Sequence, residues 1–255
     1  MKHAIQVEVC VDSVAGALAA EAGGADRVEL CADLVEGGTT PSAGTIAAVR
    51  AAIGLGLVVL VRPRAGDFLY SPAEIDVLMR DIAVAKEAGA DGVALGMLAR
   101  DGSIDSELVA RASALARPMQ VTFHRAFDLS REPFEALEVL LALGVDRVLT
   151  SGQAQSAPAG AALLGSIVLR AEGRLAVMAG GGVRAENVCA LVTASRVTEV
   201  HFSAGATAPS PMEFRSERCR MGTGRVPGEY ERRVTDVDAV RRTVTALAES
   251  RSEIS

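Results

Sequence analysis

The sequence predicts a single-domain (β/α)8 barrel of the TIM type, followed by a C-terminal extension that ends in a helix. Strand-like runs rich in Val and Leu alternate with helical runs rich in Ala, Leu and Glu, and this alternation is typical of a parallel sheet. Eight such units fit into roughly 205 residues, a size that suits a closed (β/α)8 barrel. We therefore assign about residues 1–205 to the barrel and about 206–255 to the extension, and we find no linker that divides the chain.

The expected elements follow in order along the chain. Strands are predicted near Gln6–Cys10, Arg27–Cys31, Leu57–Arg62, Gly92–Leu95, Gln120–His124, Arg147–Ser151, Leu175–Ala179 and Glu199–Ser203. Helices are predicted near Ser13–Glu21, Ala43–Ile53, Ala73–Glu87, Ser106–Ala116, Pro133–Leu143, Ala157–Glu172, Ala185–Ala194 and Val237–Ser250. A variant of Ala-Gly-Ala-Asp precedes three of the strands, and its glycine suits the left-handed residue at a helix end. The alternative, a doubly wound open sheet, normally has a glycine fingerprint after its first strand, which residues 10–13 lack.

The composition excludes several classes of protein. Of the 255 residues, 49% are hydrophobic and 23% charged, with 25 glycines and 4 cysteines, which excludes disordered, collagen-like and disulfide-scaffold chains. The net charge of −6 argues against a basic face for nucleic acid. No apolar run approaches the ~18 residues of a membrane helix, and we see neither a signal peptide nor a Cys-x-x-Cys pair. We therefore expect a cytoplasmic protein with reduced cysteines and no nucleic-acid or membrane partner.

The first two predicted strands end in matching tetrapeptides, Val7-Glu8-Val9-Cys10 and Val28-Glu29-Leu30-Cys31. Alternation along a strand turns the Glu and Cys of each tetrapeptide into the barrel and the aliphatic residues toward the helices. Neighbouring strands lie ~4.8 Å apart, so the two thiols can meet, and a thiolate pair favours Cu(I) or Zn²⁺ over hard cations. Alternatively, both cysteines serve only as small packing residues. Glu8 and Glu29 predict a polar interior, cationic partners or both, because an unpaired buried charge is costly.

Arginine and histidine residues come at the ends of the third and fifth strands, where barrel enzymes place their functional groups. Arg62 is expected either to pair with Glu8 or Glu29 or to hold an anionic ligand. His124 shares a strand face with two polar residues, which is unusual for a buried parallel strand, and we treat it as a candidate catalytic residue. The candidate set from the two strand ends is completed by Arg64, Arg125 and Asp128. Asp128 is also a candidate N-cap for the following helix.

Glycine loops follow the seventh and eighth strands. Barrels often bind phosphate with the backbone N–H groups of such loops, although a tight turn that needs positive φ explains them equally. The expected anion-binding residues are Arg64, Gly180, Gly181, Gly182, Ser203 and Gly205. His201 shares a face with Ser203 and should point inward, like His124. The arginine-rich segment 207–233 is interpreted as a solvated excursion or as a flap over the mouth of the barrel.

Several of these stretches, taken together, resemble the CutC family of copper homeostasis proteins. The matching stretches are Glu29–Cys31, Arg62–Tyr70, Phe123–Asp128, Leu149–Gly152, Gly180–Gly182, Glu186-Asn187 and Val200-His201. The resemblance extends from the first strand to near Tyr230 and departs at Ala65, where the family often has a second glycine before Gly66. It implies a cytoplasmic, oligomeric barrel (a dimer or tetramer) that binds or traffics copper, with Cys10 and Cys31 at the positions of the copper-binding cysteines.

Two functions from different classes follow. The first is a copper homeostasis protein that binds Cu(I) through Cys10 and Cys31. The second is a lyase, isomerase or hydrolase that acts on a small anionic metabolite, with or without a phosphate group, at the mouth of the barrel. Its candidate catalytic residues are Glu8, Glu29, Arg62, His124, Arg125, Asp128 and His201. A copper carrier needs the two thiols but not this surplus of charged residues, whereas an inert scaffold needs no polar interior at all.

Overall fold

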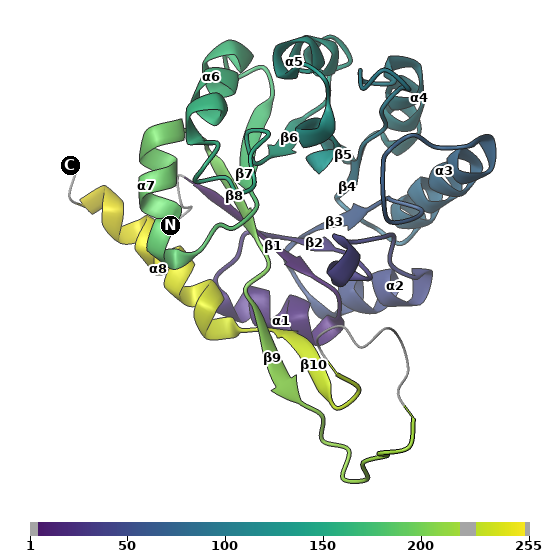
Figure 1. The fold of residues 1–255 in the computed structure, drawn as a ribbon, viewed down its shortest axis with the longest axis vertical. Helices are drawn as coiled ribbons and strands as arrows, with labels where there is room; N and C mark the ends of the chain where they lie inside the picture. Colours follow the sequence, from purple (N-terminus) through teal and green to yellow (C-terminus); the bar gives the residue numbers. More distant parts are fainter. Residues whose placement is uncertain (1–4, 220–227, 253–255) are drawn as a thin grey trace.

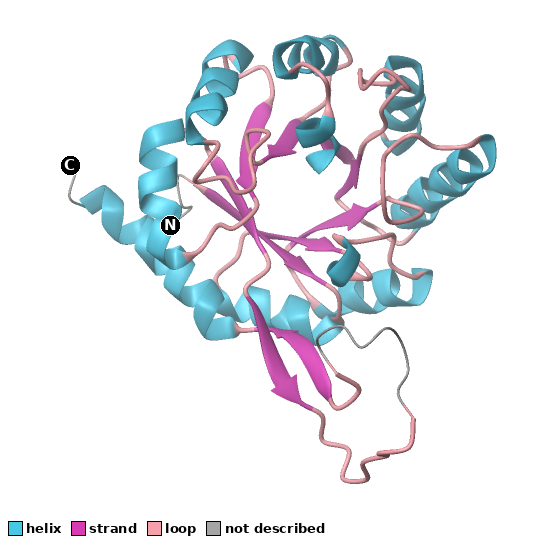
Figure 2. Cartoon of the chain, viewed as in Figure 1, coloured by secondary structure: helices cyan, strands magenta, loops and turns pink. Residues whose placement is uncertain are grey.

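The computed structural model describes residues 5–219 and 228–252, and eight parallel strands close into one barrel (Figures 1 and 2). The strands are β1 (Gln6–Val11), β2 (Arg27–Leu30), β3 (Gly56–Leu60), β4 (Gly92–Leu95), β5 (Gln120–Phe123), β6 (Arg147–Thr150), β7 (Ala176–Gly180) and β8 (Glu199–Phe202). Each strand pairs with its neighbour in the sequence, and β8 pairs with β1. The predicted barrel is therefore confirmed, and the open sheet is excluded.

Helices surround the barrel and connect its strands (Figure 1). They are α1 (Val14–Gly23), α2 (Ala43–Ala52), α3 (Pro72–Glu87), α4 (Ser106–Ala116), α5 (Pro133–Ala142), α6 (Ala161–Ala171), α7 (Ala185–Ser195) and the C-terminal α8 (Val237–Ser252), with short 3-10 turns η1 (Leu34–Glu36) and η2 (Arg125–Leu129). Ser13, Ser42 and Ser71 begin α1, α2 and α3, because each side chain accepts a backbone N–H of the first turn. In the described part of the chain, no helix combines the length and the apolar character that crossing a membrane requires.

Helix α6 begins four residues later than predicted, at Ala161 instead of Ala157. The preceding residues form a turn that packs against the end of β6. At Gly160, an added Cβ would lie 1.9 Å from the carbonyl oxygen of Ser151, so only glycine allows the two backbones to approach this closely. The turn therefore delays the helix.

Beyond the barrel, β9 (Gly205–Pro209) and β10 (Glu231–Thr235) form an antiparallel pair that projects from the molecule (Figure 1). The chain then returns to the barrel as α8, which packs against α1 and α7. Gly23 allows the close approach of α1 and α8, because an added Cβ there would lie 2.5 Å from the buried side chain of Val240. The described part of segment 207–233 is mostly exposed, but Arg233 reaches the barrel mouth. Residues 220–227 lie outside the described residues. The division into one domain remains our interpretation.

Charged side chains face the interior of the barrel, while the alternate aliphatic residues face the helices. Val7 and Val9 of β1 belong to the apolar shell between strands and helices, whereas Glu8 between them is buried inside. Arg27 bonds Glu8 and, at 2.6 Å, Glu199. This arrangement keeps the carboxylates paired, which a buried charge requires.

The network continues across the lower barrel through Arg147. Its guanidinium bonds both oxygens of Glu199, with a distance of 3.2 Å from Nη2 to Oε1, and it donates to the hydroxyl of Thr122 at 3.2 Å. Arg27, Arg147 and Glu199 were not among the predicted site residues. Each lies two positions before an inward residue of its own strand (Glu29, Leu149 and His201 respectively), so the alternation that placed Glu8 inward would also have found them.

Replacing Glu199 by Ala should destabilise the barrel strongly, because Arg147 and one side of Arg27 lose their buried carboxylate. Removing one partner of a buried ion pair costs about 3–5 kcal/mol. The matched control, Glu138→Ala, breaks the exposed Glu138–Arg170 pair and should cost no more than about 1 kcal/mol. Urea denaturation measures both losses, and equal losses would contradict the structural importance of the interior network.

Candidate functional site

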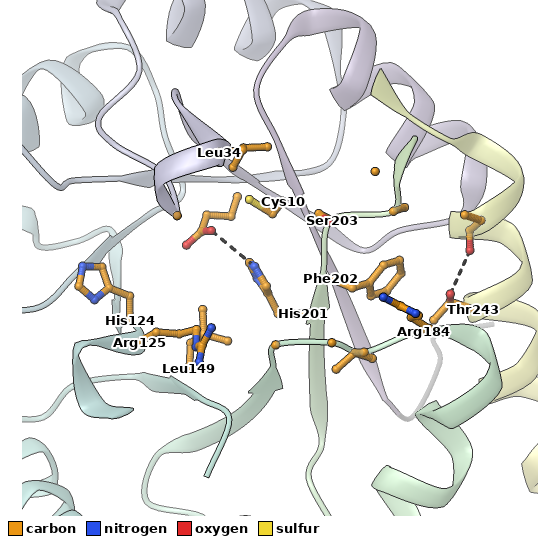
Figure 3. A pocket seen from close by; sticks show the side chains of 18 of the residues that line it. Cys10, Leu34, His124, Arg125, Leu149, Arg184, His201, Phe202, Ser203 and Thr243 are labelled. Atoms are coloured by element: carbon orange, nitrogen blue, oxygen red, sulfur yellow. Dashed lines mark hydrogen bonds and ion pairs between the residues drawn. The ribbon is translucent and has the colours of Figure 1, made fainter. Parts of the chain in front are cut away.

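The carboxyl ends of the strands open onto a cavity of about 610 Å³. Figure 3 shows His124 and Arg125 on one side of this mouth, Arg184 and Thr243 on the other, and His201 between them. The predicted residues that line the cavity are Cys10, Glu29, Arg62, His124, Arg125, Gly181, Gly182, His201, Ser203 and Gly205. The strand ends therefore bring together most of the residues that the sequence indicated.

The two cysteines predicted to face each other do so beneath the mouth. The register of β1 and β2 places Cys10 opposite Glu29, and Cys31 lies just beyond β2. The Sγ atoms of Cys10 and Cys31 are 3.5 Å apart, and Oε2 of Glu29 is 3.5 Å from Sγ of Cys31. All three residues are buried, and their ligand atoms lie within 4.8 Å of one another. They can therefore hold a metal ion together.

His201 lies between the two inward glutamates. Its Nδ1 is 2.8 Å from Oε1 of Glu8, and its Nε2 is 3.6 Å from Oε2 of Glu29. Burial lowers the pKa of the imidazole, but Glu29, Cys10 and Glu8 outweigh that effect and raise the pKa well above its usual value. Burial likewise raises the pKa of Glu8, but Arg27 and His201 lower it to about 2. A charged imidazole and a charged Glu8 therefore lie next to the thiols.

The remaining groups of the cluster titrate closer to neutral pH. Burial raises the pKa of Glu29 to about 8, although the nearby His201 opposes this. A hydrogen bond from the Cys31 thiol lowers the pKa of Cys10 to about 6 against the effect of burial, and His201 adds to the lowering. The bond to the Cys10 sulfur and burial raise the pKa of Cys31. Near neutral pH the pair is thus one thiolate, Cys10, that accepts a hydrogen bond from one thiol.

The expected ion pair of Arg62 with Glu8 or Glu29 is wrong. The side chain turns instead toward the loops after β2 and β3, where it donates to the carbonyl oxygens of Glu36 at 2.9 Å, Gly38 at 2.8 Å and Gly66 at 2.9 Å. The carboxylate of Glu8 bonds Arg27 and His201 instead, which lie on its two neighbouring strands. Arg62 still lines the mouth.

Two members of the predicted anion site lie outside the mouth. Arg64 forms ion pairs with Glu74 at 2.6 Å and Asp67 at 3.0 Å, and its guanidinium stacks over the ring of Tyr70. Gly180 is the last residue of β7, where it pairs with β8 and does not line the cavity. The candidate anion site is thus reduced to Gly181, Gly182, Ser203 and Gly205, the first two of which have positive φ.

Asp128 does not cap the following helix, contrary to the prediction. Glu132 caps α5, because η2 intervenes between the strand and the helix. Asp128 instead accepts hydrogen bonds from the backbone N–H of Ser151 at 3.0 Å and from its hydroxyl at 2.9 Å, and it pairs with Arg125 at 2.8 Å. It orients the end of β6 and one wall of the mouth without lining the cavity itself.

Four charged residues at the mouth were missed by the sequence reasoning. Arg184 and Glu186 come from the start of α7, Arg233 from β10 and Arg242 from α8. Arg184 could have been found, because it follows the glycine loop by two residues. Arg233 ends the segment 207–233, for which a flap over the mouth was one of the two interpretations. Arg242 could not have been found, since only the return of the C-terminal extension brings it to the barrel.

The effect of Glu8 on stability should depend on pH. Its pKa is about 2 in the folded protein against an ordinary value of 4.5, so the folded state favours the charged form. This contribution is fully present above about pH 4.5 and is lost as the pH falls toward 2. The two pKa values correspond to roughly 3 kcal/mol near neutral pH.

Urea denaturation of the wild type and Glu8→Gln should therefore show a stability difference that shrinks by about half or more between about pH 7 and pH 3. The matched control Glu138→Gln, at an exposed carboxylate, should show no such trend. A difference for Glu8→Gln that does not change with pH would contradict the electrostatic role of this carboxylate.

Comparison with known proteins identifies the family. The sequence profile of the CutC family matches residues 5–206. The human copper homeostasis protein cutC homolog is 49% identical over 244 residues, which cover 96% of this chain and 89% of that protein. The CutC family protein of Chromobacterium violaceum is 48% identical over 241 residues, which cover 94% of this chain and 97% of that protein.

Solved structures agree with this result. The crystal structure of the copper homeostasis protein CutC from Streptococcus agalactiae aligns with a TM-score of 0.75 at 30% identity, covering 78% of this chain and 98% of that one. Phosphoribosylanthranilate isomerase from Thermotoga maritima aligns with a TM-score of 0.58 at 16% identity over 96% of this chain and 99% of that one, and it shares the fold alone. On the profile match, the sequence identities and the aligned structure, this chain belongs to the CutC family.

Proposed function

We propose that this protein serves copper homeostasis by binding Cu(I) through Cys10 and Cys31. The observation that carries the proposal is the 3.5 Å separation of two buried cysteine sulfur atoms that form no disulfide, which a single ion can bridge. Thiolates favour Cu(I) and Zn²⁺ over hard cations, and the presence of copper homeostasis proteins among the relatives favours Cu(I) of the two. The lowered pKa of Cys10 supports binding, because the thiolate and not the thiol is the metal ligand.

The separation of the sulfur atoms favours a bent site with a third ligand. With metal–sulfur bonds of ~2.3 Å, as in zinc thiolates, two sulfurs 3.5 Å apart subtend roughly 100° at the metal, whereas a linear site would need ~4.6 Å. An oxygen of Glu29 lies within 4.8 Å of both sulfur atoms, so we assign Glu29 as the third ligand. Because its pKa without metal is about 8, metal binding there releases its proton. His201, which contacts Glu29 and Glu8, would then orient the carboxylate.

Location and assembly are part of the proposal. A cytoplasmic location is supported by the four cysteines, none of which forms a disulfide in the structure, because a reducing compartment keeps thiols free. The resemblance to the CutC family supports a homo-oligomer, either a dimer or a tetramer. Size-exclusion chromatography with light scattering tests the oligomeric state directly.

A second candidate function is an enzyme that acts on a small anionic metabolite at the mouth. The specific observation that favours it is the charge of the cavity wall, where five arginines face two glutamates. These residues are Arg62, Arg125, Arg184, Arg233, Arg242, Glu29 and Glu186. Two copper-binding thiols do not need this excess of positive charge, whereas a ligand of opposite charge does.

Competition for Cu(I) against a chelator that binds Cu(I) tightly tests the first function. The reduced wild type should withdraw one equivalent of Cu(I) per chain, and Cys10→Ser with Cys31→Ser should weaken binding at least about a hundredfold, because soft thiolates are replaced by hydroxyls. Cys189→Ser is the matched control, since Cys189 lies on α7 away from the pair and bonds the carbonyl oxygen of Ala246. Unchanged affinity in the double variant would exclude the cysteine site.

A further inference from the structure

Two buried N–H donors at the mouth have no hydrogen-bond partner among the described residues. They are Nε of Arg62 and Nε2 of His124. The two residues are only 7% and 5% exposed, and both line the cavity. A buried donor left without an acceptor costs about 1–3 kcal/mol, and native proteins leave few such groups unpaired. The pair therefore calls for an acceptor that the chain itself does not supply.

The contacts of His124 determine which ring nitrogen carries its proton. Nδ1 accepts the backbone N–H of Ala126 at 3.2 Å, so the neutral ring carries its proton on Nε2. Burial, with a smaller effect from Arg62, lowers the pKa of His124 to about 3. The ring is therefore neutral near pH 7 and is a hydrogen-bond donor, not a base.

Arg62 is a buried cation that makes its hydrogen bonds to carbonyl oxygens only. Nη1 and Nη2 donate to three backbone carbonyls of the loops after β2 and β3, and no ion pair joins Arg62 to a carboxylate among the described residues. Buried charges are normally paired with an opposite charge. A ligand that accepts a hydrogen bond from Nε of Arg62 should therefore be an anion, because it would also balance the buried positive charge.

Phe68 brings the two donors to one wall of the mouth. The guanidinium carbon of Arg62 lies 5.1 Å from the centroid of the Phe68 ring, and the ring centroid of His124 lies 5.0 Å from the same point. Phe68 itself is buried and lines the cavity. Both side chains thus pack on the same aromatic ring in the wall of the mouth.

We infer that the mouth binds a small carboxylic acid whose carboxylate accepts hydrogen bonds from Nε of Arg62 and Nε2 of His124. This inference rests on the second proposed function, that the mouth takes a small anion, and is independent of copper. Two donors match the two oxygens of a carboxylate. Phosphate, with more oxygens, is better suited to the glycine loop Gly181-Gly182 at the end of β7, because both residues have positive φ and such loops can present successive backbone N–H groups.

Thermal unfolding of the wild type with three probes at constant ionic strength tests the class of ligand. Succinate presents carboxylates, succinamide has the same size without charge, and inorganic phosphate presents a different oxyanion. A ligand that binds the native state raises the unfolding midpoint in proportion to its affinity and concentration. Succinate should raise the midpoint, phosphate should raise it less, and succinamide should leave it unchanged.

Two substitutions at one position test the role of His124. His124→Asn retains an acceptor near the position of Nδ1 but removes the donor at Nε2, whereas His124→Gln retains an N–H donor of similar reach. Succinate should bind His124→Asn at least about tenfold more weakly than the wild type, as expected for the loss of one hydrogen bond to a charged group. His124→Gln should lie between them, and Cys10→Ser with Cys31→Ser should bind like the wild type.

A nitrogen-15 spectrum of the histidine side chains gives a second measurement that needs no variant at His124. The chain has only 3 histidines, and the Nε2 resonance of His124 should shift when succinate is added to the wild type. Equal succinate affinity in the wild type and His124→Asn, an unshifted Nε2 resonance, or a preference for phosphate would overturn the inference while leaving the anion-binding function to stand on the other probes. A preference for the uncharged succinamide would overturn both. No response to succinate or phosphate would overturn both.

Discussion

The polar interior depends on Arg27, which neutralises two carboxylates at once. Without it, Glu8 would keep only His201 as a charged partner and Glu199 only Arg147, and a buried carboxylate is costly without such partners. With it, Glu8 is held as an anion and, together with the larger effect of Glu29, favours the charged form of His201. A hydrogen bond from Cys31 favours a thiolate at Cys10, and His201 adds to this effect. Arg27 thus contributes to the thiolate indirectly, through Glu8 and His201.

The mouth above this network has two chemically different regions. The region formed by β1, β2 and β8 carries the thiols, Glu29 and His201, and is suited to a soft metal ion. The region after β3 and β5 carries Arg62 and His124, whose free N–H groups suit an oxygen acceptor. One cavity joins both regions, and different residues form each of them. The two proposed functions are therefore compatible.

The sequence was sufficient to predict the barrel and to predict which side chains of its strands face the interior. The alternation of strands and helices predicted the closure, and the two-residue period of a strand placed Glu8, Cys10 and Cys31 in the interior, as the structure confirms. The period was as clear for Arg27 and Glu199, but these residues lie at the amino ends of their strands, away from the carboxyl ends where barrel sites form. Residues at the amino ends support the site by charge rather than by contact with a ligand.

Long side chains beyond the strands were harder to place. Arg62 follows β3 at a position whose side chain points into the barrel. Its side chain is long enough to reach carbonyl oxygens of a neighbouring loop, and the residue pattern of a strand does not reveal such contacts. The side chain of Arg64 lies away from the mouth because it pairs with Glu74, which belongs to the capping box at the start of α3. Arg233 and Arg242 reach the cavity only because β9 pairs with β10 and α8 returns to the barrel. Such contacts depend on tertiary structure far from the residue in sequence.

X-ray absorption at the copper edge of the Cu(I)-loaded, reduced protein tests the central claim most directly. The account predicts three ligands, two sulfur atoms and one lighter oxygen or nitrogen atom, in a bent arrangement that the 3.5 Å spacing of the two thiols favours. In Glu29→Gln the lighter ligand should weaken or disappear while both sulfur atoms remain. A spectrum with no sulfur ligands, or one identical in the wild type and the Cys10→Ser, Cys31→Ser protein, would contradict the assignment of this pair as the copper site.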